Sequence, residues 1–208
     1  MFDAVIFDLD GTLIDTESVA LRTGRAAFAA LDAPLDETVF HSLIGKDVTS
    51  GDAILRAAHP DLDLVALNRL WRSGFEAEIA RNLPLKPGVF ELLGLLRQPR
   101  ALCTSSGRDS AHYKLGLAGL ADAFAHVVTL DDVQTAKPHP EPYLLTAAKL
   151  GVAPARCVVF EDSETGAAAA KAAGCVVVQV PDVLPTDGRH ADHVAASLLD
   201  GARRVGLI

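Results

Sequence analysis

The chain has few cysteines, and they are not spaced as a disulfide framework or a zinc site would need. Its 208 residues include three cysteines, an odd number, and no two of them form a CxxC pair. Paired cysteines at short spacing are typical of disulfide-rich domains and structural zinc sites. Because Cys103, Cys157 and Cys175 each lie in or beside an apolar run, we expect them to be small buried hydrophobic residues.

Basic clusters and long apolar runs are also missing. Lys and Arg total 19 against 27 Asp and Glu, so the net charge is −8, with no basic block along the chain. Nucleic acid and anionic membrane surfaces are therefore poor candidate partners, and an anionic substrate must meet local positive charge. The longest weakly polar run, TGAAAAKAAGCVVVQVP, is shorter than the ~20 residues that a membrane span needs, and no signal-type segment is seen. We expect a cytoplasmic protein with no membrane partner.

Several common catalytic and nucleotide-binding signatures do not occur. No GxSxG motif surrounds Ser105 or Ser106, and the chain has neither a GxGxxG sequence nor a Walker loop. The sequence therefore gives no support to a serine hydrolase, a dinucleotide-binding protein or a P-loop nucleotide-binding protein.

The sequence does contain five short runs rich in β-branched and aromatic residues, at 3–8, 100–104, 125–129, 157–161 and 175–180. Their nearly continuous apolar content is typical of strands buried on both faces of a parallel sheet. Helical patterns separate most of them, at 88–97, 109–118, 140–150 and 163–173. This alternation predicts a doubly wound α/β fold. The C-terminal stretch 181–200 is expected to form a loop and a last short helix.

One long segment interrupts the alternation. Residues 16–85 show no strand signal, and apolar residues such as Leu64, Leu67 and Trp71 recur at spacings of three and four. We expect an all-helical insertion at 16–85 within an α/β core formed by 1–15 and 86–208. The stretch LPLKPGV, with two prolines and a glycine, is the expected return hinge.

Polar residues follow the predicted strands. They are Asp8, Asp10 and Gly11 after the first run, Thr104, Ser105 and Ser106 after the second, and Glu161 and Asp162 at the end of the fourth. Ligands of parallel α/β sheets bind beyond the carboxyl ends of the strands, so these residues are expected at one site. Asp8 and Asp10 point to the same side of a strand with Cα atoms roughly 7 Å apart, and two anions so placed require a positive partner.

Lys137, in the stretch TAKPHPEPY, is a candidate for part of that positive charge. A group of carboxylates with one lysine suits Mg²⁺ together with a phosphate that the metal and the lysine share. Gly11 would allow backbone N–H groups to approach the anion. The segment TSSGRD opens a predicted helix whose first amides are a suitable phosphate cradle.

Four segments resemble, in order, the four motifs of the haloacid dehalogenase superfamily: FDLDGTLIDTE, CTSSGR, AKPHPEPY and VVFEDSETGAAAAKAAG. The insertion resembles the α-helical cap of the phosphoglycolate phosphatase and β-phosphoglucomutase branch. The resemblance implies a Rossmann-like core and a cap that opens to admit substrate and closes to exclude water.

The resemblance also implies residue roles. Asp8 would be the nucleophile that forms an aspartyl phosphate, and Asp10 the general acid and base. Thr104 and the Ser105 amide would bind the phosphoryl group, and Lys137 would neutralise its oxygens. The predicted Mg²⁺ ligands are Asp8, the Asp10 carbonyl, Asp162 and, directly or through water, Glu161. The predicted substrate-binding residues are Gly11, Ser105, Ser106 and, in the cap turn HSLIGKDVTSGD, Gly45 and Lys46.

Differences between this sequence and the motifs of other branches of the superfamily reduce the number of activities to be considered. Dehalogenases of this superfamily lack the second aspartate, so Asp10 counts against carbon–halogen cleavage, and the surroundings of Lys46 do not suggest the Schiff-base lysine of phosphonate hydrolases. The sequences GTL and SVAL, where mutases often have GVI and a histidine, favour a phosphatase. We therefore expect a monomeric Mg²⁺-dependent phosphatase of a small phosphorylated metabolite such as a sugar phosphate. The alternatives are a β-phosphoglucomutase-like hexose phosphate mutase and a catalytically silent binding protein.

Overall fold

The structure, a computed structural model, describes residues 2–43 and 48–208. The chain forms two compact units. We call Met1–Asp15 with Leu83–Ile208 the core unit, and Thr16–Asn82 the helical unit. Each is described by itself.

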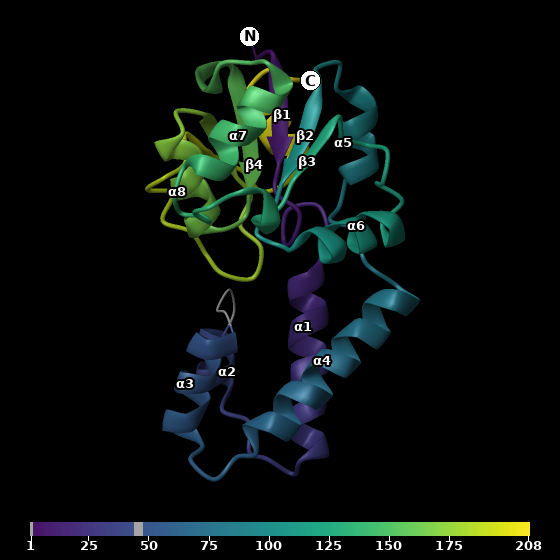
Figure 1. Cartoon of the computed structure of the whole chain (residues 1–208), viewed down its shortest axis with the longest axis vertical. Coiled ribbons are helices and arrows are strands. Elements are labelled where there is room, and N and C mark those ends of the chain that lie inside the picture. Colours follow the sequence, from purple (N-terminus) through teal and green to yellow (C-terminus); the bar gives the residue numbers. More distant parts are fainter. Residues whose placement is uncertain (1, 44–47) are drawn as a thin grey trace. The chain divides into compact units, whose positions relative to one another are not determined.

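The core unit is built on a six-stranded parallel sheet (Figure 1). Its strands are β1 (Ala4–Phe7), β2 (Arg100–Cys103), β3 (His126–Val128), β4 (Cys157–Glu161), β5 (Val176–Gln179) and β6 (His193–Val194). Their order across the sheet is β3-β2-β1-β4-β5-β6. The predicted parallel α/β sheet is confirmed, and each of the five predicted runs contains a strand. Strand β6 corrects the expectation that 181–200 forms only a loop and a helix.

Helices cover both faces of this sheet, as Figure 1 shows for α7 and α8 on one side and α5 and α6 on the other. The helices of the core unit are α5 (Val89–Leu95), α6 (Arg108–Leu117), α7 (Glu141–Leu150), α8 (Glu164–Ala172) and α9 (Leu198–Arg204), with 3₁₀ turns at Leu130–Asp132 and Pro154–Arg156. Tyr143 of α7 and Ala167 of α8 share a buried cluster with Val159 of β4. On the other face, a Cβ at Gly201 of α9 would lie 3.0 Å from the Phe160 ring. Alternate residues of one strand thus contact helices on opposite faces, which explains its unbroken apolar sequence.

The three cysteines are buried and free, as the sequence predicts. Burial raises the pKa of the Cys103 and Cys157 thiols to about 11, and that of Cys175 to about 12. They therefore remain protonated near neutral pH and act as small hydrophobic residues.

Two adjacent segments carry the chain out of the core unit and back into it. The amide of Asp15 donates to the Pro84 carbonyl at 2.9 Å, and that of Lys86 donates to the Leu13 carbonyl at 2.9 Å. Ile14 and Leu85 form an antiparallel bridge between them. The two ends of the inserted segment are therefore fixed to each other inside the core unit.

The described part of the helical unit contains α1 (Thr16–Ala30), α2 (Glu37–Ser42), α3 (Val48–Ala58) and α4 (Leu64–Arg81). Phe28, Phe40 and Leu67 form its buried centre, and the Trp71 ring stacks on Phe40 at 5.4 Å between centroids. The expectation of an all-helical insertion is met by these helices. None of the helices in the described part of the chain has the length and apolarity needed to cross a bilayer.

Candidate active site

The candidate active site lies at the carboxyl ends of β1 and β4. These strands are neighbours, and Phe7 pairs with Phe160, so Asp8 and Glu161 follow at the same level of the sheet. In the sheet, β2 and β3 lie on one side of β1, and β4 and β5 lie on its other side. Such a switch in strand order is where ligands of doubly wound sheets bind.

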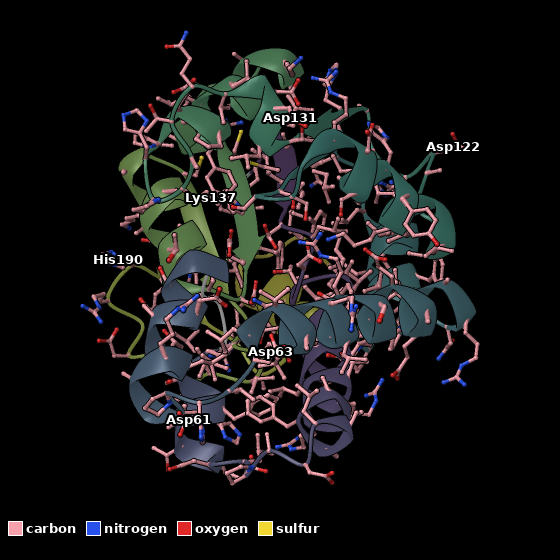
Figure 2. The ribbon with its side chains drawn as sticks, turned by 60° about the horizontal axis from the view of Figure 1, so that its bottom comes forward. Asp61, Asp63, Asp122, Asp131, Lys137 and His190 are labelled. Atoms are coloured by element: carbon pink, nitrogen blue, oxygen red, sulfur yellow. The ribbon has the colours of Figure 1, made fainter. Side chains whose placement is uncertain are left out.

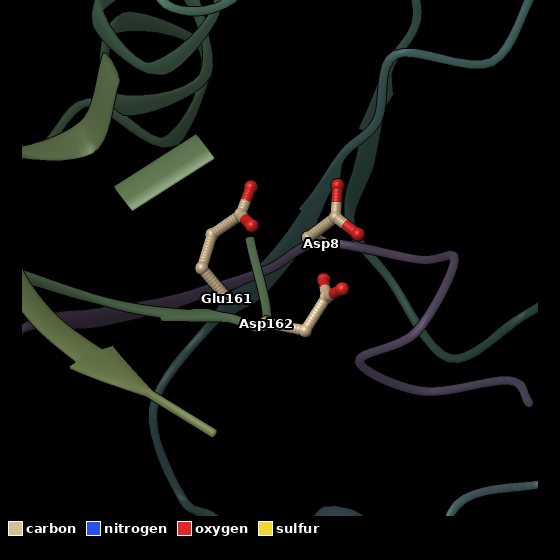
Figure 3. Close-up of side chains that lie close together, drawn as sticks. All are labelled: Asp8, Glu161 and Asp162. Atoms are coloured by element: carbon tan, nitrogen blue, oxygen red, sulfur yellow. The ribbon is translucent and has the colours of Figure 1, made fainter. Parts of the chain in front are cut away.

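Three carboxylates meet at this point, as Figure 3 shows. Asp8, Glu161 and Asp162 each offer an oxygen, and these oxygens all lie within 4.8 Å of one another. Burial raises the pKa of Asp8 to about 7, and the charge of Glu161 adds to this effect while Lys137 opposes it. Hard carboxylate oxygens in a crowded group are the ligands that Mg²⁺ prefers. The donor set therefore fits the predicted divalent cation.

Lys137, labelled in Figure 2, joins two of these carboxylates. Its Nζ donates to Asp8 Oδ1 and to Glu161 Oε1, both at 2.7 Å, and to the Cys103 carbonyl at 3.0 Å. The side chain is 4% exposed. Burial disfavours its charged form, but the carboxylates of Asp8 and Glu161 outweigh burial and raise the pKa of Lys137 well above its ordinary value. The ammonium therefore stays charged beside the predicted nucleophile.

Glu161 is fully buried and held on every side. Its Oε1 accepts hydrogen bonds from Lys137 and from the Tyr143 hydroxyl at 2.6 Å. Its Oε2 accepts from the hydroxyl of Ser163 at 2.9 Å and from the amide of Ser163 at 3.3 Å. A Cβ at Gly166 would lie 1.7 Å from Oε1, so that position requires glycine. Since a carboxylate has about four acceptor sites, Glu161 is better suited to orient Lys137 than to bind a metal directly.

Asp162 lies against Gly11 in the turn after β1. The Thr12 hydroxyl donates to Asp162 Oδ1 at 3.0 Å. Gly11 has a φ of 84°, and a Cβ there would lie 2.4 Å from Asp162 Oδ2. The amide of Gly11 donates to the Ile14 carbonyl at 2.8 Å. In this structure the glycine thus gives room to Asp162, and its own N–H serves the turn.

The segment after β2 brings Ser106 to Asp10. The buried Thr104 hydroxyl oxygen accepts from the Ser106 amide at 3.0 Å, and the Ser106 hydroxyl donates to Asp10 Oδ2 at 2.8 Å. Ser105 is exposed. At the start of α6, the Arg108 amide donates to Asp131 Oδ2 at 2.7 Å. That amide, part of the predicted phosphate cradle, is therefore capped by a side chain of the same chain.

Two functional candidates were not identified from the sequence, Tyr143 and Lys114. Lys114 Nζ lies 2.7 Å from both carboxylate oxygens of Asp10 and 2.8 Å from Ser106 Oγ. The signal that could have found it is helical spacing, because Lys114 falls on the stripe formed by Ala111, Leu115 and Ala118, where an apolar residue is expected. The predicted cap residues Gly45 and Lys46 lie outside the described residues.

Comparisons with known proteins show which family the chain is similar to. A protein-family model described as "Hydrolase: haloacid dehalogenase-like hydrolase" matches residues 2–174. The fructose-1-phosphate phosphatase of Escherichia coli (strain K12) is 34% identical over 183 residues, which cover 86% of this chain and 96% of that protein.

Two solved structures are also similar. A haloacid dehalogenase family hydrolase from Deinococcus radiodurans R1, crystallised with bound phosphate and sodium, is 33% identical, with a TM-score of 0.75 and coverage of 86% of this chain and 80% of that one. The β-phosphoglucomutase of Clostridium difficile is 26% identical, with a TM-score of 0.71 and coverage of 95% and 92%.

Proposed function

Because the chain belongs to the haloacid dehalogenase-like hydrolase family, we propose that this phosphoric monoester hydrolase is a Mg²⁺-dependent phosphatase of small sugar phosphates that works through an aspartyl phosphate. The observation that carries the proposal is the position of Asp8. It follows β1, faces Glu161 and Asp162, and accepts a hydrogen bond from the ammonium of Lys137. A carboxylate held this way is directed and charge-balanced for attack on phosphorus.

In the first proposed step, a carboxylate oxygen of Asp8 attacks the phosphorus of the substrate and forms a new P–O bond. The bond between phosphorus and the sugar oxygen breaks, and Asp10 gives its proton to that oxygen as the alcohol leaves. Thr104 and the amide of Ser105 are assigned to hold the phosphoryl oxygens. Lys137 keeps its positive charge beside Asp8 throughout this step.

In the second step, water attacks the phosphorus of the aspartyl phosphate. Asp10 now takes a proton from that water, the bond between phosphorus and Asp8 breaks, and inorganic phosphate is released. Asp10 is thereby returned to its protonated form, so one carboxyl group serves both steps. No further reactant is needed.

The predicted metal is assigned to Asp8, Asp162 and the carbonyl of Asp10, with Glu161 acting through its contacts to Lys137 and Tyr143. Bound there, Mg²⁺ supplies positive charge that offsets the carboxylates and the phosphoryl oxygens. The geometry supports this assignment, because carboxylate oxygens of Asp8, Glu161 and Asp162 lie within 4.8 Å of one another and a cation beside them would offset their repulsion.

The proposed substrate class is supported by a similar protein of known name and by the charged residues of the core site. The fructose-1-phosphate phosphatase of Escherichia coli is similar to this chain over 96% of its own length. The core site offers a cation and carboxylates suited to one phosphoryl group. We assign the choice of the sugar to the insertion predicted at 16–85, and propose that the protein acts as a monomer on a small phosphorylated substrate.

A hexose phosphate mutase is the second candidate, because the similar structure from Clostridium difficile is a β-phosphoglucomutase. A mutase returns the phosphoryl group to a second hydroxyl of the sugar, whereas a phosphatase gives it to water. The two activities therefore differ in whether free phosphate appears.

The test is an assay of phosphate release from a panel of sugar phosphates with Mg²⁺, beside β-glucose 1-phosphate with a hexose bisphosphate activator. We expect free phosphate, loss of turnover in Asp8→Asn and loss of activity with EDTA. Asp3→Asn, an exposed position of the core unit, is the folding control and should keep full activity. Isomer without free phosphate would establish the mutase instead. Full activity of Asp8→Asn, or no effect of EDTA, would reject the proposed mechanism.

A further inference from the structure

Lys114 is a buried cation outside the residues that the mechanism above uses. It lies on α6 between Ala111 and Leu115, both buried, and is itself only 6% exposed. Lysine is almost never found so deeply buried unless it is paired, because removing an ammonium from water is costly. Its partners therefore explain why it is there.

Those partners are Asp10 and Ser106, which form a closed triangle with Lys114. The ammonium lies 2.7 Å from Asp10 Oδ1, 2.7 Å from Asp10 Oδ2 and 2.8 Å from Ser106 Oγ. The Ser106 hydroxyl in turn donates to Asp10 Oδ2 at 2.8 Å. A lysine ammonium has three N–H donors, and these three contacts use them. Lys114 is thus committed to holding Asp10 and Ser106, and it is not arranged to bind a substrate oxygen.

The same pattern occurs at Asp8, where Lys137 is also buried and also makes three contacts. The two aspartates of the first motif therefore have separate lysines, one from the loop before α7 and one from α6. The Asp10 side chain is 32% exposed, whereas that of Asp8 is 10% exposed. A side chain this accessible to water gains most from a fixed support, since fewer packing contacts restrict its rotamer.

We propose that Lys114 is a positioning residue for Asp10: with Ser106, it fixes the carboxyl group that gives a proton to the leaving oxygen and later takes one from water. This inference rests on the proposed phosphatase mechanism. Without the ammonium, Asp10 keeps its chemistry but loses its orientation, so both proton transfers slow while the attack of Asp8 on phosphorus is spared.

The test compares two leaving groups. An alkyl phosphate, the best sugar phosphate from the panel, needs its leaving oxygen protonated, whereas p-nitrophenyl phosphate releases a stable phenolate without help. For Lys114→Met we expect kcat/KM to fall about 100-fold on the sugar phosphate, as for loss of a general acid, and to change little on p-nitrophenyl phosphate. The ratio of the two values does not depend on how much of the preparation is folded, so a purely structural role of Lys114 leaves it unchanged.

A second readout follows from the second step. The value of kcat/KM reports only the steps up to transfer of the phosphoryl group to Asp8, so slower attack by water lowers kcat and not kcat/KM. Lys114→Met should therefore release a burst of p-nitrophenol equal to the enzyme concentration before the slower steady rate. In an Asp10→Asn background, Lys114→Met should cause no further change in the leaving-group ratio, since both changes remove the same function. Ser106→Ala should move the ratio in the same direction by less, and it carries the test if Lys114→Met does not fold.

Lys149→Met, an exposed lysine on α7, is the matched control and should behave as the unmodified protein. An unchanged ratio, an equal loss on both substrates or a faster enzyme would overturn the role of Lys114. If the unmodified protein releases no phosphate from any substrate, the proposed function fails first and this inference falls with it. The two failures are distinguishable, because the results that would overturn the role of Lys114 can be measured only if the unmodified protein is active.

Discussion

At the scale of single residues, the site depends on how buried charges are balanced. Asp8 and Glu161 share the ammonium of Lys137, and Tyr143 and Ser163 complete the hydrogen bonding of Glu161. Removing one partner of such a buried group leaves an uncompensated charge, which costs more than the group contributes when intact. The residues around Glu161 therefore hold Lys137 in place through Glu161.

Gly11 gives a sharp residue-scale prediction. Gly11→Ala must strain the backbone at a φ of 84° and also push Asp162 away, because the new Cβ would lie 2.4 Å from its carboxylate. We expect the affinity for Mg²⁺ to fall by about 10-fold to 100-fold, the range found when support for a metal ligand is lost. The measurement is the Mg²⁺ concentration that gives half-maximal activity.

The chain contains a matched control for this change. Gly174 also has a φ of 84°, but a Cβ there meets nothing within 4 Å. Gly174→Ala should carry the same strain, roughly 1–2 kcal/mol, and should leave Mg²⁺ binding as it was. Equal effects of the two substitutions on Mg²⁺ affinity would show that the contact with Asp162 is unimportant.

Residue types and strand positions were enough to predict which side chains gather at one edge of the sheet. Asp8, Lys137, Glu161 and Asp162 lie close together in the structure, and their catalytic and metal-binding roles stay predictions. Acids at neighbouring strand ends and a lysine before a helix can be recognised in a sequence. Lys114 was not foreseen, since a lysine in a helix is usually solvated and only its place on the apolar stripe marks it. Which donor serves which oxygen depends on side-chain geometry that the sequence does not contain.

At the scale of elements, the strands with long apolar runs were predicted within a residue or two, whereas β6 was not. It has two residues, His193 and Val194, and carries no apolar run to mark it. It pairs with β5 because Asp192 contacts the preceding backbone: its Oδ2 accepts from the Val177 amide at 2.9 Å, and its own amide donates to the Val177 carbonyl at 2.9 Å. A side chain thus completes a ladder that backbone propensity could not predict.

Asp192→Ala tests this account of the sheet edge. The substitution leaves the amide of the buried Val177 without its acceptor and removes the ion pair with Lys171. We expect the free energy of unfolding to fall by about 1–3 kcal/mol, the cost of an unsatisfied buried group, with phosphatase activity unchanged. Urea unfolding measures the loss. Asp187→Ala, an exposed aspartate of the same loop, should change stability by less than ~0.5 kcal/mol; an equally small effect of Asp192→Ala would contradict the account.

At the scale of the whole molecule, we expect the crowded carboxylates of the proposed metal site to make stability depend on Mg²⁺ and pH together. The pKa of Asp8 in the folded, metal-free protein is about 7, above its ordinary value. The folded state therefore binds a proton that the unfolded state has already lost, and this group's contribution to stability falls as pH rises toward 7. Mg²⁺ binds the ionised form, so the metal competes with that proton at pH 6 and not at pH 8.

We therefore expect Mg²⁺ to raise the melting temperature more at pH 8 than at pH 6. At a concentration 100 times the dissociation constant, the gain is about 2.7 kcal/mol, and each kcal/mol corresponds to roughly 2–4 °C for a chain of this size. Thermal unfolding with Mg²⁺ or EDTA at both pH values measures the shift. Asp162→Asn should lose the response at both, and an equal shift at pH 6 and pH 8 would contradict the raised pKa of Asp8.

The two adjacent segments that carry the chain out of the core unit and back into it make the inserted segment separable from the sheet. Because the Asp15 amide donates to the Pro84 carbonyl, the chain leaves the core unit for Thr16–Asn82 and returns to it through two adjacent, hydrogen-bonded backbone segments. A short hairpin turn could join Asp15 to Pro84 without disturbing the sheet, and a different set of helices could be inserted at the same point. We expect such an exchange to alter the choice of substrate, which we propose belongs to the inserted segment, and to leave the residues of the core site unchanged.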